Sequence, residues 1–140
     1  HASMIAFGLS QSFKSGNVFC IDGDGASLMH MGNLTTIGQS NSGNLIHIVL
    51  NNGAHDSVGG QPTCANEISL PEIAKASGYK SAMSVSRLEL IGDEVEKLKD
   101  SSGPHFLEIK IKTGAREDLG RPTSSPSENL GHLMHFLESQ

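Results

Sequence analysis

Two short stretches combine glycine with an acidic or amide side chain directly after an apolar run. Gly23-Asp24-Gly25 follows the run 18–21, and Asn51-Asn52-Gly53 follows the run 45–50. Flanking glycines let a backbone turn sharply and let an anion approach its N–H groups. A carboxylate beside an anion makes sense when a divalent cation lies between them, and Asp and Asn oxygens suit Mg2+. The two stretches therefore predict a metal-bridged diphosphate site.

Two other interpretations of these residues exist. Asp24 and Asn52 are of types that are common in turns after strands, whatever the function. Asp22 and Asp24 also match the start of an EF-hand loop, but the twelfth position is Asn33 instead of Glu and an apolar strand pattern precedes the loop. The calcium-loop interpretation is therefore rejected.

The rest of the chain alternates short apolar runs with helical patterns. We expect strands at 17–22, 44–51, 80–85 and 104–112, and helices near 3–13, 27–40, 70–78, 86–99 and 128–138. Such alternation is typical of an α/β fold with three α/β/α layers and a mainly parallel sheet. Because 18–21 and 45–50 carry few charges, both are expected to be central strands. In such sheets a ligand binds beyond the carboxyl ends of the strands, where both polar stretches lie.

Local signals define several helix ends. Ser69 followed by Pro71 predicts a helix start, and Gly78 predicts its end. Ser86 with Glu89 has the spacing of a capping box. Ser27 is expected to cap the helix after Asp24 and to donate a hydrogen bond to a phosphate oxygen.

Other side chains are weaker candidates for chemistry. His55 follows the second polar stretch and could bind a dianionic substrate or move a proton, although it could also be a solvated loop residue. Arg116 and Arg121 could hold a phosphonate group, or could simply be surface charges. His132 and His135 are three residues apart, but no third metal ligand accompanies them, which favours an amphipathic helix face.

Composition excludes several classes of protein. With 140 residues the chain is expected to form one domain. Its net charge is −5 and it has no basic block, which excludes a nucleic-acid binder. The longest apolar run, 45–50, is too short to span a membrane. Cys20 and Cys64 lack metal-ligand spacing, and Cys20 reads as a buried reduced thiol, so a cytoplasmic protein is expected.

The paired polar stretches resemble the cofactor-binding motif of the thiamine-diphosphate-dependent decarboxylases. This resemblance implies that thiamine diphosphate and Mg2+ are the cofactors. It also implies that Asp24, the side-chain oxygen of Asn52 and the carbonyl of Ala54 hold the metal. The cofactor-binding residues that it implies are Gly23, Asp24, Gly25, Ala26, Ser27, Asn52 and Ala54.

The segments 51–63 and 116–123 resemble the phosphonopyruvate decarboxylases within that family, with the sulfopyruvate decarboxylases as near relatives. The resemblance implies conversion of 3-phosphonopyruvate to phosphonoacetaldehyde and CO2, with His55 as the candidate catalytic residue. The glutamate that activates the cofactor in such enzymes belongs to a pyrimidine-binding domain, usually of a partner subunit. We therefore expect a homo-oligomeric enzyme of which this chain, inactive alone, supplies half a site.

Residues 1–140 are expected to be one thiamine-diphosphate-binding domain from the C-terminal part of a longer enzyme. The opening His-Ala-Ser resembles a native segment of that family, which favours a fragment, while a vector-derived tag before Met4 is the alternative. A sulfopyruvate decarboxylase subunit and a non-catalytic module that binds a partner subunit are the competing functions.

Overall fold

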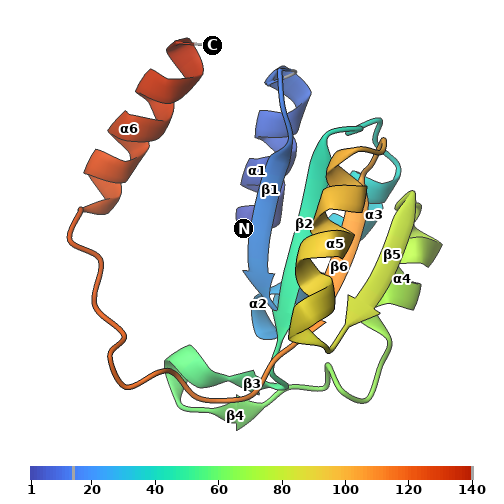
Figure 1. Ribbon diagram of the computed structural model, residues 1–140, viewed down its shortest axis with the longest axis vertical. Helices are drawn as coiled ribbons and strands as arrows, with labels where there is room; N and C mark the ends of the chain where they lie inside the picture. The colour runs from blue at the N-terminus through green and yellow to red at the C-terminus, as the bar shows by residue number, and fades with distance from the viewer. Residues whose placement is uncertain (14, 140) are drawn as a thin grey trace.

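The computed structural model describes residues 1–13 and 15–139 and consists of helices on both faces of a parallel sheet (Figure 1). The strands of the main sheet are β1 (Val18–Gly23), β2 (Leu45–Asn51), β5 (Ser81–Val85) and β6 (His105–Lys110). The helices are α1 (Ala2–Ser12), α2 (Asp24–Met29), α3 (Gly32–Gly38), α4 (Leu70–Ser77), α5 (Leu88–Lys99) and α6 (Pro126–Glu138). The predicted three-layer α/β/α fold is confirmed.

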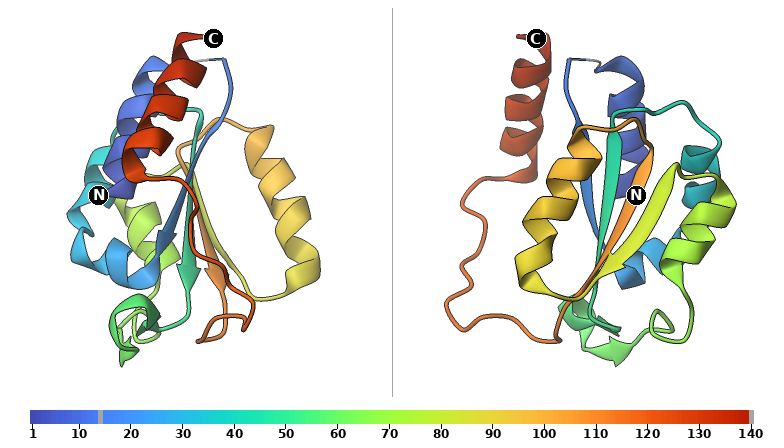
Figure 2. Two further views of the ribbon diagram at one scale, coloured as in Figure 1. Left: turned by 90° about the vertical axis from the view of Figure 1, so that its left-hand side faces the viewer. Right: turned by 45° about the vertical axis from the view of Figure 1, so that its right-hand side comes forward.

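The sheet has the strand order β1-β2-β6-β5, and all its pairs are parallel. Helices α1 to α4 cover one face and α5 covers the other (Figure 2). Phe106, Leu45 and Val49 belong to the core under α1 to α4, and Ile46 and Leu107 belong to the core under α5. Burial of these side chains on both faces fixes β2 and β6 as the central strands.

The prediction that 18–21 is a central strand is wrong. Within the described part of the chain β1 is an edge strand, and Phe19 and Ile21 on it are 43% and 65% exposed. An apolar run is the same in sequence whether or not a second strand pairs with it, so composition alone does not separate edge from centre.

The helix expected over 27–40 is divided into α2 and α3. The break is at His30, whose backbone (φ −128°, ψ 37°) has left the helical region. Gly32, a weak helix former, then begins α3. Helix α2 itself starts at Asp24, three residues before the predicted start and directly after β1.

The helix caps were predicted with mixed success. Ser69 accepts a hydrogen bond from the Glu72 N–H, and Gly78 ends α4 with φ 107°, so both predictions are confirmed. Ser86 is not the N-cap of α5, because the helix starts one residue later than expected and Arg87 takes that position without a side-chain cap. The predicted capping box is therefore wrong.

The chain beyond β6 runs outside the layers. A long segment leads from Lys110 to α6, which stands beside the body of the molecule (Figure 1). The loop after β2 contains a short antiparallel pair, β3 (Ala54–His55) with β4 (Gln61–Pro62), and a 3-10 helix at Asp56–Val58. Within the described residues, no helix combines the length and the apolar character needed to cross a membrane.

Candidate functional site

The two polar stretches lie side by side at one edge of the sheet. Strands β1 and β2 are parallel and in register, with Gly23 paired to Leu50, so both stretches leave the sheet at its carboxyl end. A pocket of about 340 Å³ lies there. It is lined by Gly23, Asp24, Gly25, Ala26, Leu50, Asn52, Ala54, His55, Asp56, Ser57 and Ile111. The fold thus gathers all the predicted cofactor and catalytic residues except Ser27 around one pocket.

Asp24 is the first residue of α2 and is only 2% exposed. Its Oδ2 accepts a hydrogen bond of 2.5 Å from the Thr63 hydroxyl. The Thr63 hydroxyl oxygen in turn accepts a hydrogen bond from the Ala65 N–H at 3.3 Å. A buried carboxylate is costly unless it is hydrogen-bonded or paired with a cation, and Thr63 meets part of that need. Thr63 was not predicted from the sequence.

The Asn52 side chain is held at both of its polar atoms. Its Oδ1 accepts a hydrogen bond from the Ala54 N–H at 3.0 Å, and its Nδ2 donates to Asp56 Oδ2 at 2.8 Å. Gly53 between them has φ 70°, and a Cβ there would lie 2.3 Å from Asn66 Nδ2. Glycine adopts this positive φ without strain and leaves the Asn66 amide in place, and the turn presents the Asn52 amide and the Ala54 backbone to the pocket.

His55 packs directly against the first polar stretch. A Cβ on Gly25 would lie 2.3 Å from His55 Nδ1, so the imidazole occupies space that any other residue at position 25 would fill. His55 is half-buried and connects the two stretches at the wall of the pocket. Its catalytic role stays a prediction.

Ser27 does not cap a helix. The N-cap of α2 is Gly23, because the helix begins immediately after the strand, so Ser27 lies inside it. Its hydroxyl is buried and has no hydrogen-bond partner in the part of the chain that the structure describes. Ser27 does not line the pocket, and the predicted contact with a phosphate oxygen stays a prediction.

The arginines lie in the segment after β6. Arg116 and Arg121 are exposed and do not line the pocket. Arg116 pairs with Asp118 at 3.1 Å. The segment nevertheless starts at the site, because the Gly114 N–H donates to Asp56 Oδ2 at 2.7 Å. The role of Arg116 and Arg121 in binding substrate stays a prediction.

His132 and His135 also lie outside the site. Both are exposed on α6, and in residues 1–13 and 15–139 no Cys, Asp, Glu or further His joins them in a group of three donors. The helix-face interpretation therefore remains the simpler one.

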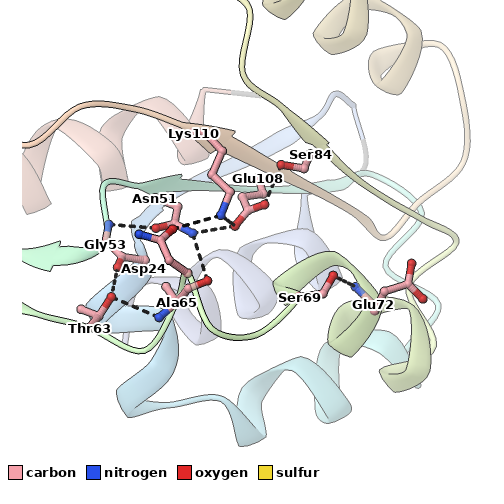
Figure 3. A network of polar contacts seen from close by, with 11 residues as sticks. Asp24, Asn51, Gly53, Thr63, Ala65, Ser69, Glu72, Ser84, Glu108 and Lys110 are labelled. Carbon is pink, nitrogen blue, oxygen red and sulfur yellow. Dashed lines mark hydrogen bonds and ion pairs between the residues drawn. The ribbon is translucent and has the colours of Figure 1, made fainter.

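A polar network built around two buried side chains, Asn51 and Glu108, joins the ends of β2, β5 and β6 (Figure 3). Asn51 and Glu108, 1% and 2% exposed, are joined by a hydrogen bond of 2.7 Å from Asn51 Nδ2 to Glu108 Oε1. Glu108 also accepts from the Ser84 hydroxyl at 2.6 Å and pairs with Lys110 at 3.0 Å. Burial would raise the pKa of Glu108, but the hydrogen bonds from Ser84 and Asn51, together with Lys110, hold that pKa below its usual value.

A second polar cluster lies nearby on the α1 to α4 face of the sheet. His47 Nε2 is 3.6 Å from Asp22 Oδ2, and His47 Nδ1 is 3.2 Å from the Tyr79 hydroxyl. Burial would raise the pKa of Asp22, but His47 holds it below the usual value. Burial and the neighbouring Asp22 raise the pKa of Cys20 to about 11. Cys20 is therefore a protonated, free thiol, as predicted.

Comparisons with known proteins point to one family. Residues 2–109 match the family described as "Thiamine pyrophosphate enzyme, C-terminal TPP binding domain". Phosphonopyruvate decarboxylase of Streptomyces viridochromogenes is 40% identical over 120 residues, which are 86% of this chain and 30% of that protein. Sulfopyruvate decarboxylase subunit beta of Methanococcus maripaludis is 33% identical over 137 residues, 98% of this chain and 72% of that subunit.

A solved structure supports the fold. Benzoylformate decarboxylase from Polynucleobacter necessarius superposes with a TM-score of 0.67 at 19% identity, over 82% of this chain and 23% of that one. The chain thus spans about 30% of the length of the phosphonopyruvate decarboxylases that it matches.

Proposed function

Because this chain belongs to the family of C-terminal cofactor-binding domains of thiamine pyrophosphate enzymes, we propose that it supplies the diphosphate- and Mg2+-binding half of a phosphonopyruvate decarboxylase. The observation that carries the proposal is the pocket at the ends of β1 and β2, where Asp24, Asn52 and Ala54 lie around one space. Relatives named phosphonopyruvate decarboxylase, at 40% and 37% identity, support this substrate.

The residues around the pocket fit a hard cation that carries a diphosphate. The Asp24 carboxylate, the Asn52 Oδ1 and the Ala54 carbonyl are oxygen donors of the kind that Mg2+ prefers. Asp24 is buried, and a divalent cation would offset the cost of its charge. Gly25 leaves room for the His55 imidazole, since a Cβ there would lie 2.3 Å from His55 Nδ1, so the imidazole lies directly against the glycine-flanked turn of the proposed diphosphate site.

Thiamine diphosphate, when bound, supplies the electron sink for decarboxylation of a 2-oxo acid. The residues of this chain bind and orient. Asp24, Asn52 and Ala54 would hold the metal, and the backbone of Gly23, Gly25 and Ala26 would lie against the diphosphate. His55 would bind the substrate's dianionic group or carry a proton on its imidazole at the wall of the pocket. Ser27 would donate its unpaired hydroxyl to a phosphate oxygen.

A partner is part of the proposal. The activating glutamate would come from a pyrimidine-binding domain, in a further part of the enzyme or in another subunit of a homo-oligomer. The match to a separate beta subunit of sulfopyruvate decarboxylase supports a domain that works with a partner. Residues 1–140 are then one binding domain from the C-terminal part of a longer enzyme. Two free cysteines support a cytoplasmic location.

Arg116 and Arg121 belong to the proposal as secondary substrate residues. The hydrogen bond from Gly114 to Asp56 ties the start of their segment to the site. Guanidinium groups bind phosphonate in a bidentate manner, so these side chains would act if the segment folds over the pocket when substrate is present.

Steady-state kinetics of the complete enzyme with 3-phosphonopyruvate and sulfopyruvate test the substrate. We expect kcat/KM to favour phosphonopyruvate, because the relatives of that name are 40% and 37% identical over 120 and 119 residues, whereas the sulfopyruvate relative at 42% identity matches only 78 residues. A strong preference for sulfopyruvate would instead establish the alternative that the match to the beta subunits supports. The purified chain alone is the control and should show no decarboxylation, since half of the site is absent.

A further inference from the structure

The turn that presents Asn52 and Ala54 is held from below by the side chain before it. Asn51, the last residue of β2, accepts a hydrogen bond on Oδ1 from the Gly53 N–H at 2.9 Å. Its Nδ2 donates to Glu108 Oε1 at 2.7 Å (Figure 3). One buried amide thus joins the central strand β6 to the turn.

Glu108 is itself fixed by two further strand residues. Ser84 on β5 donates to its Oε2 at 2.6 Å, and Lys110 lies 3.0 Å from its Oε1. A buried carboxylate in such a network is weak evidence for stability, because an apolar residue of similar size often serves a core as well. Because Glu108 is bonded to Asn51, which holds the turn at Gly53, its position points to a role in fixing the conformation of that turn.

The opposite side of the turn leads to Asp24. The Thr63 N–H donates to the Gly53 carbonyl at 2.8 Å, while the Thr63 hydroxyl donates to Asp24. Gly53 is therefore held through its N–H by Asn51 and through its carbonyl by Thr63. The residues from Glu108 to Asp24 form one connected set of hydrogen bonds, and both ligand-bearing segments are attached to it.

We infer that Glu108 is a positioning residue, which acts through Asn51 to keep the turn at Gly53 in the conformation that aims Asn52 and Ala54 at the metal. This inference depends on the proposed function, because the metal ligands are those proposed above. Glu108 does not line the pocket. It sets the Mg2+ affinity of the site by limiting the conformations of the turn.

Three variants of the complete enzyme separate position from simple stability. Glu108→Leu removes the acceptor for Asn51. Glu108→Gln keeps an oxygen that can accept the same bond. His105→Leu is the matched control, since His105 is also a buried polar residue of β6, bonded to Ser81 at 2.7 Å, but stands at the start of the strand.

Two measurements are needed on each variant. The first is the Mg2+ concentration at half-saturation of thiamine diphosphate binding, measured by calorimetry. The second is hydrogen exchange without ligands in peptides that include the Gly53 amide. For Glu108→Leu we expect about a tenfold higher Mg2+ requirement, the effect of one lost hydrogen bond to a charged group, and faster exchange at Gly53. Glu108→Gln and His105→Leu should keep both values within about threefold of wild type.

The possible failures are distinguishable. If the wild-type enzyme binds thiamine diphosphate without Mg2+, the proposed function fails. If its binding needs Mg2+ but Glu108→Leu changes neither measurement, or His105→Leu changes both equally, only the positioning role is overturned.

If Glu108→Leu does not fold, the inference can still be tested by exchanging the amide and the carboxylate between positions 51 and 108. Asn51→Asp places two carboxylates together and should raise the Mg2+ requirement. The double variant Asn51→Asp with Glu108→Gln restores the bond with donor and acceptor reversed, and should return the requirement to within about threefold of wild type. Absence of this rescue would overturn the inference.

Discussion

The carboxyl end of the sheet and the segment after Lys110 differ in burial and in the origin of their hydrogen bonds. At the strand ends Asp24, Asn51 and Glu108 are buried, and each has a hydrogen-bond partner from a distant part of the chain. Nearly all residues after Lys110 are exposed, and α6 is held by its own capping box, Ser125 with Glu128. The first region is specified by tertiary contacts, whereas the second is specified by local sequence.

This difference indicates where function constrains the chain. Buried polar groups are costly, so a fold retains them where their geometry is needed. Among the described residues, the buried carboxylates Asp24 and Glu108 and the buried amide Asn51 lie at the pocket or next to it. The exposed apolar residues of α6, among them Leu130, Met134 and Phe136, contribute little to the same core. Substitutions in the two regions should therefore differ strongly in effect.

The largest effect on stability is expected from Phe106→Ala. Phe106 is fully buried on β6 and meets the rings of His47 and Tyr79 edge-on, with centroids 5.3 and 5.7 Å away. Removal of such a side chain leaves a cavity and should lower the free energy of unfolding by about 3–5 kcal/mol. Denaturant unfolding followed by circular dichroism measures this. A loss below about 1 kcal/mol would show that the centre of the sheet does not carry the fold.

Asp24→Ala should affect binding far more than folding. Loss of the carboxylate should weaken Mg2+-dependent binding of thiamine diphosphate in the complete enzyme by about 100-fold, since changes to residues that merely support metal ligands cost 10–100-fold. Calorimetry measures the binding, and Asp118→Ala, which removes an exposed carboxylate, is the control. Unchanged affinity in Asp24→Ala would contradict the ligand assignment.

The sequence allowed the pocket to be predicted but not its support. The glycine-flanked Asp24 and Asn52 are local signals, and parallel alternation placed both at one edge of the sheet. The bond between Asn51 and Glu108 joins residues 57 positions apart, and it exists only because β6 lies next to β2. A lone Glu within the apolar run 106–109 was the signal available, since a charge in a central strand needs a partner.

Other failures have the same origin. The residues of the apolar run 18–21 do not distinguish an edge strand from a central one, because strand order depends on how the helices that connect the strands pack on the sheet. Ser86 and Ser27 are both residues that commonly cap helices. The start of a helix, however, is set by where the preceding strand or loop ends, and α5 begins at Leu88 and α2 at Asp24. Ser69 with Pro71 and Gly78 was predicted correctly because those signals are complete within the segment itself.

The pH dependence of stability should reveal the charge of Glu108. Its pKa is lowered in the folded protein from the usual 4.5, so the ionised form stabilises the fold above that pH. This contribution is lost as the pH falls through the folded-state pKa. The stability advantage of wild type over Glu108→Gln should thus be present at neutral pH and shrink below about pH 4.5. Urea unfolding of both proteins across this range measures it, and a constant difference would contradict the assigned charge.

Phe136→Ala should have the smallest effect and gives the sharpest contrast with Phe106→Ala. Phe136 is 50% exposed on α6, and its ring centroid lies 6.2 Å from that of Phe13 at the end of α1. One half-exposed aromatic contact is worth at most about 1.5 kcal/mol, so the free energy of unfolding should fall by no more than about 1.5 kcal/mol. The same denaturant titration measures both variants. A loss as large as that of Phe106→Ala would mean that α6 packs into the folded core in solution, because only a fully buried ring leaves a cavity of that cost.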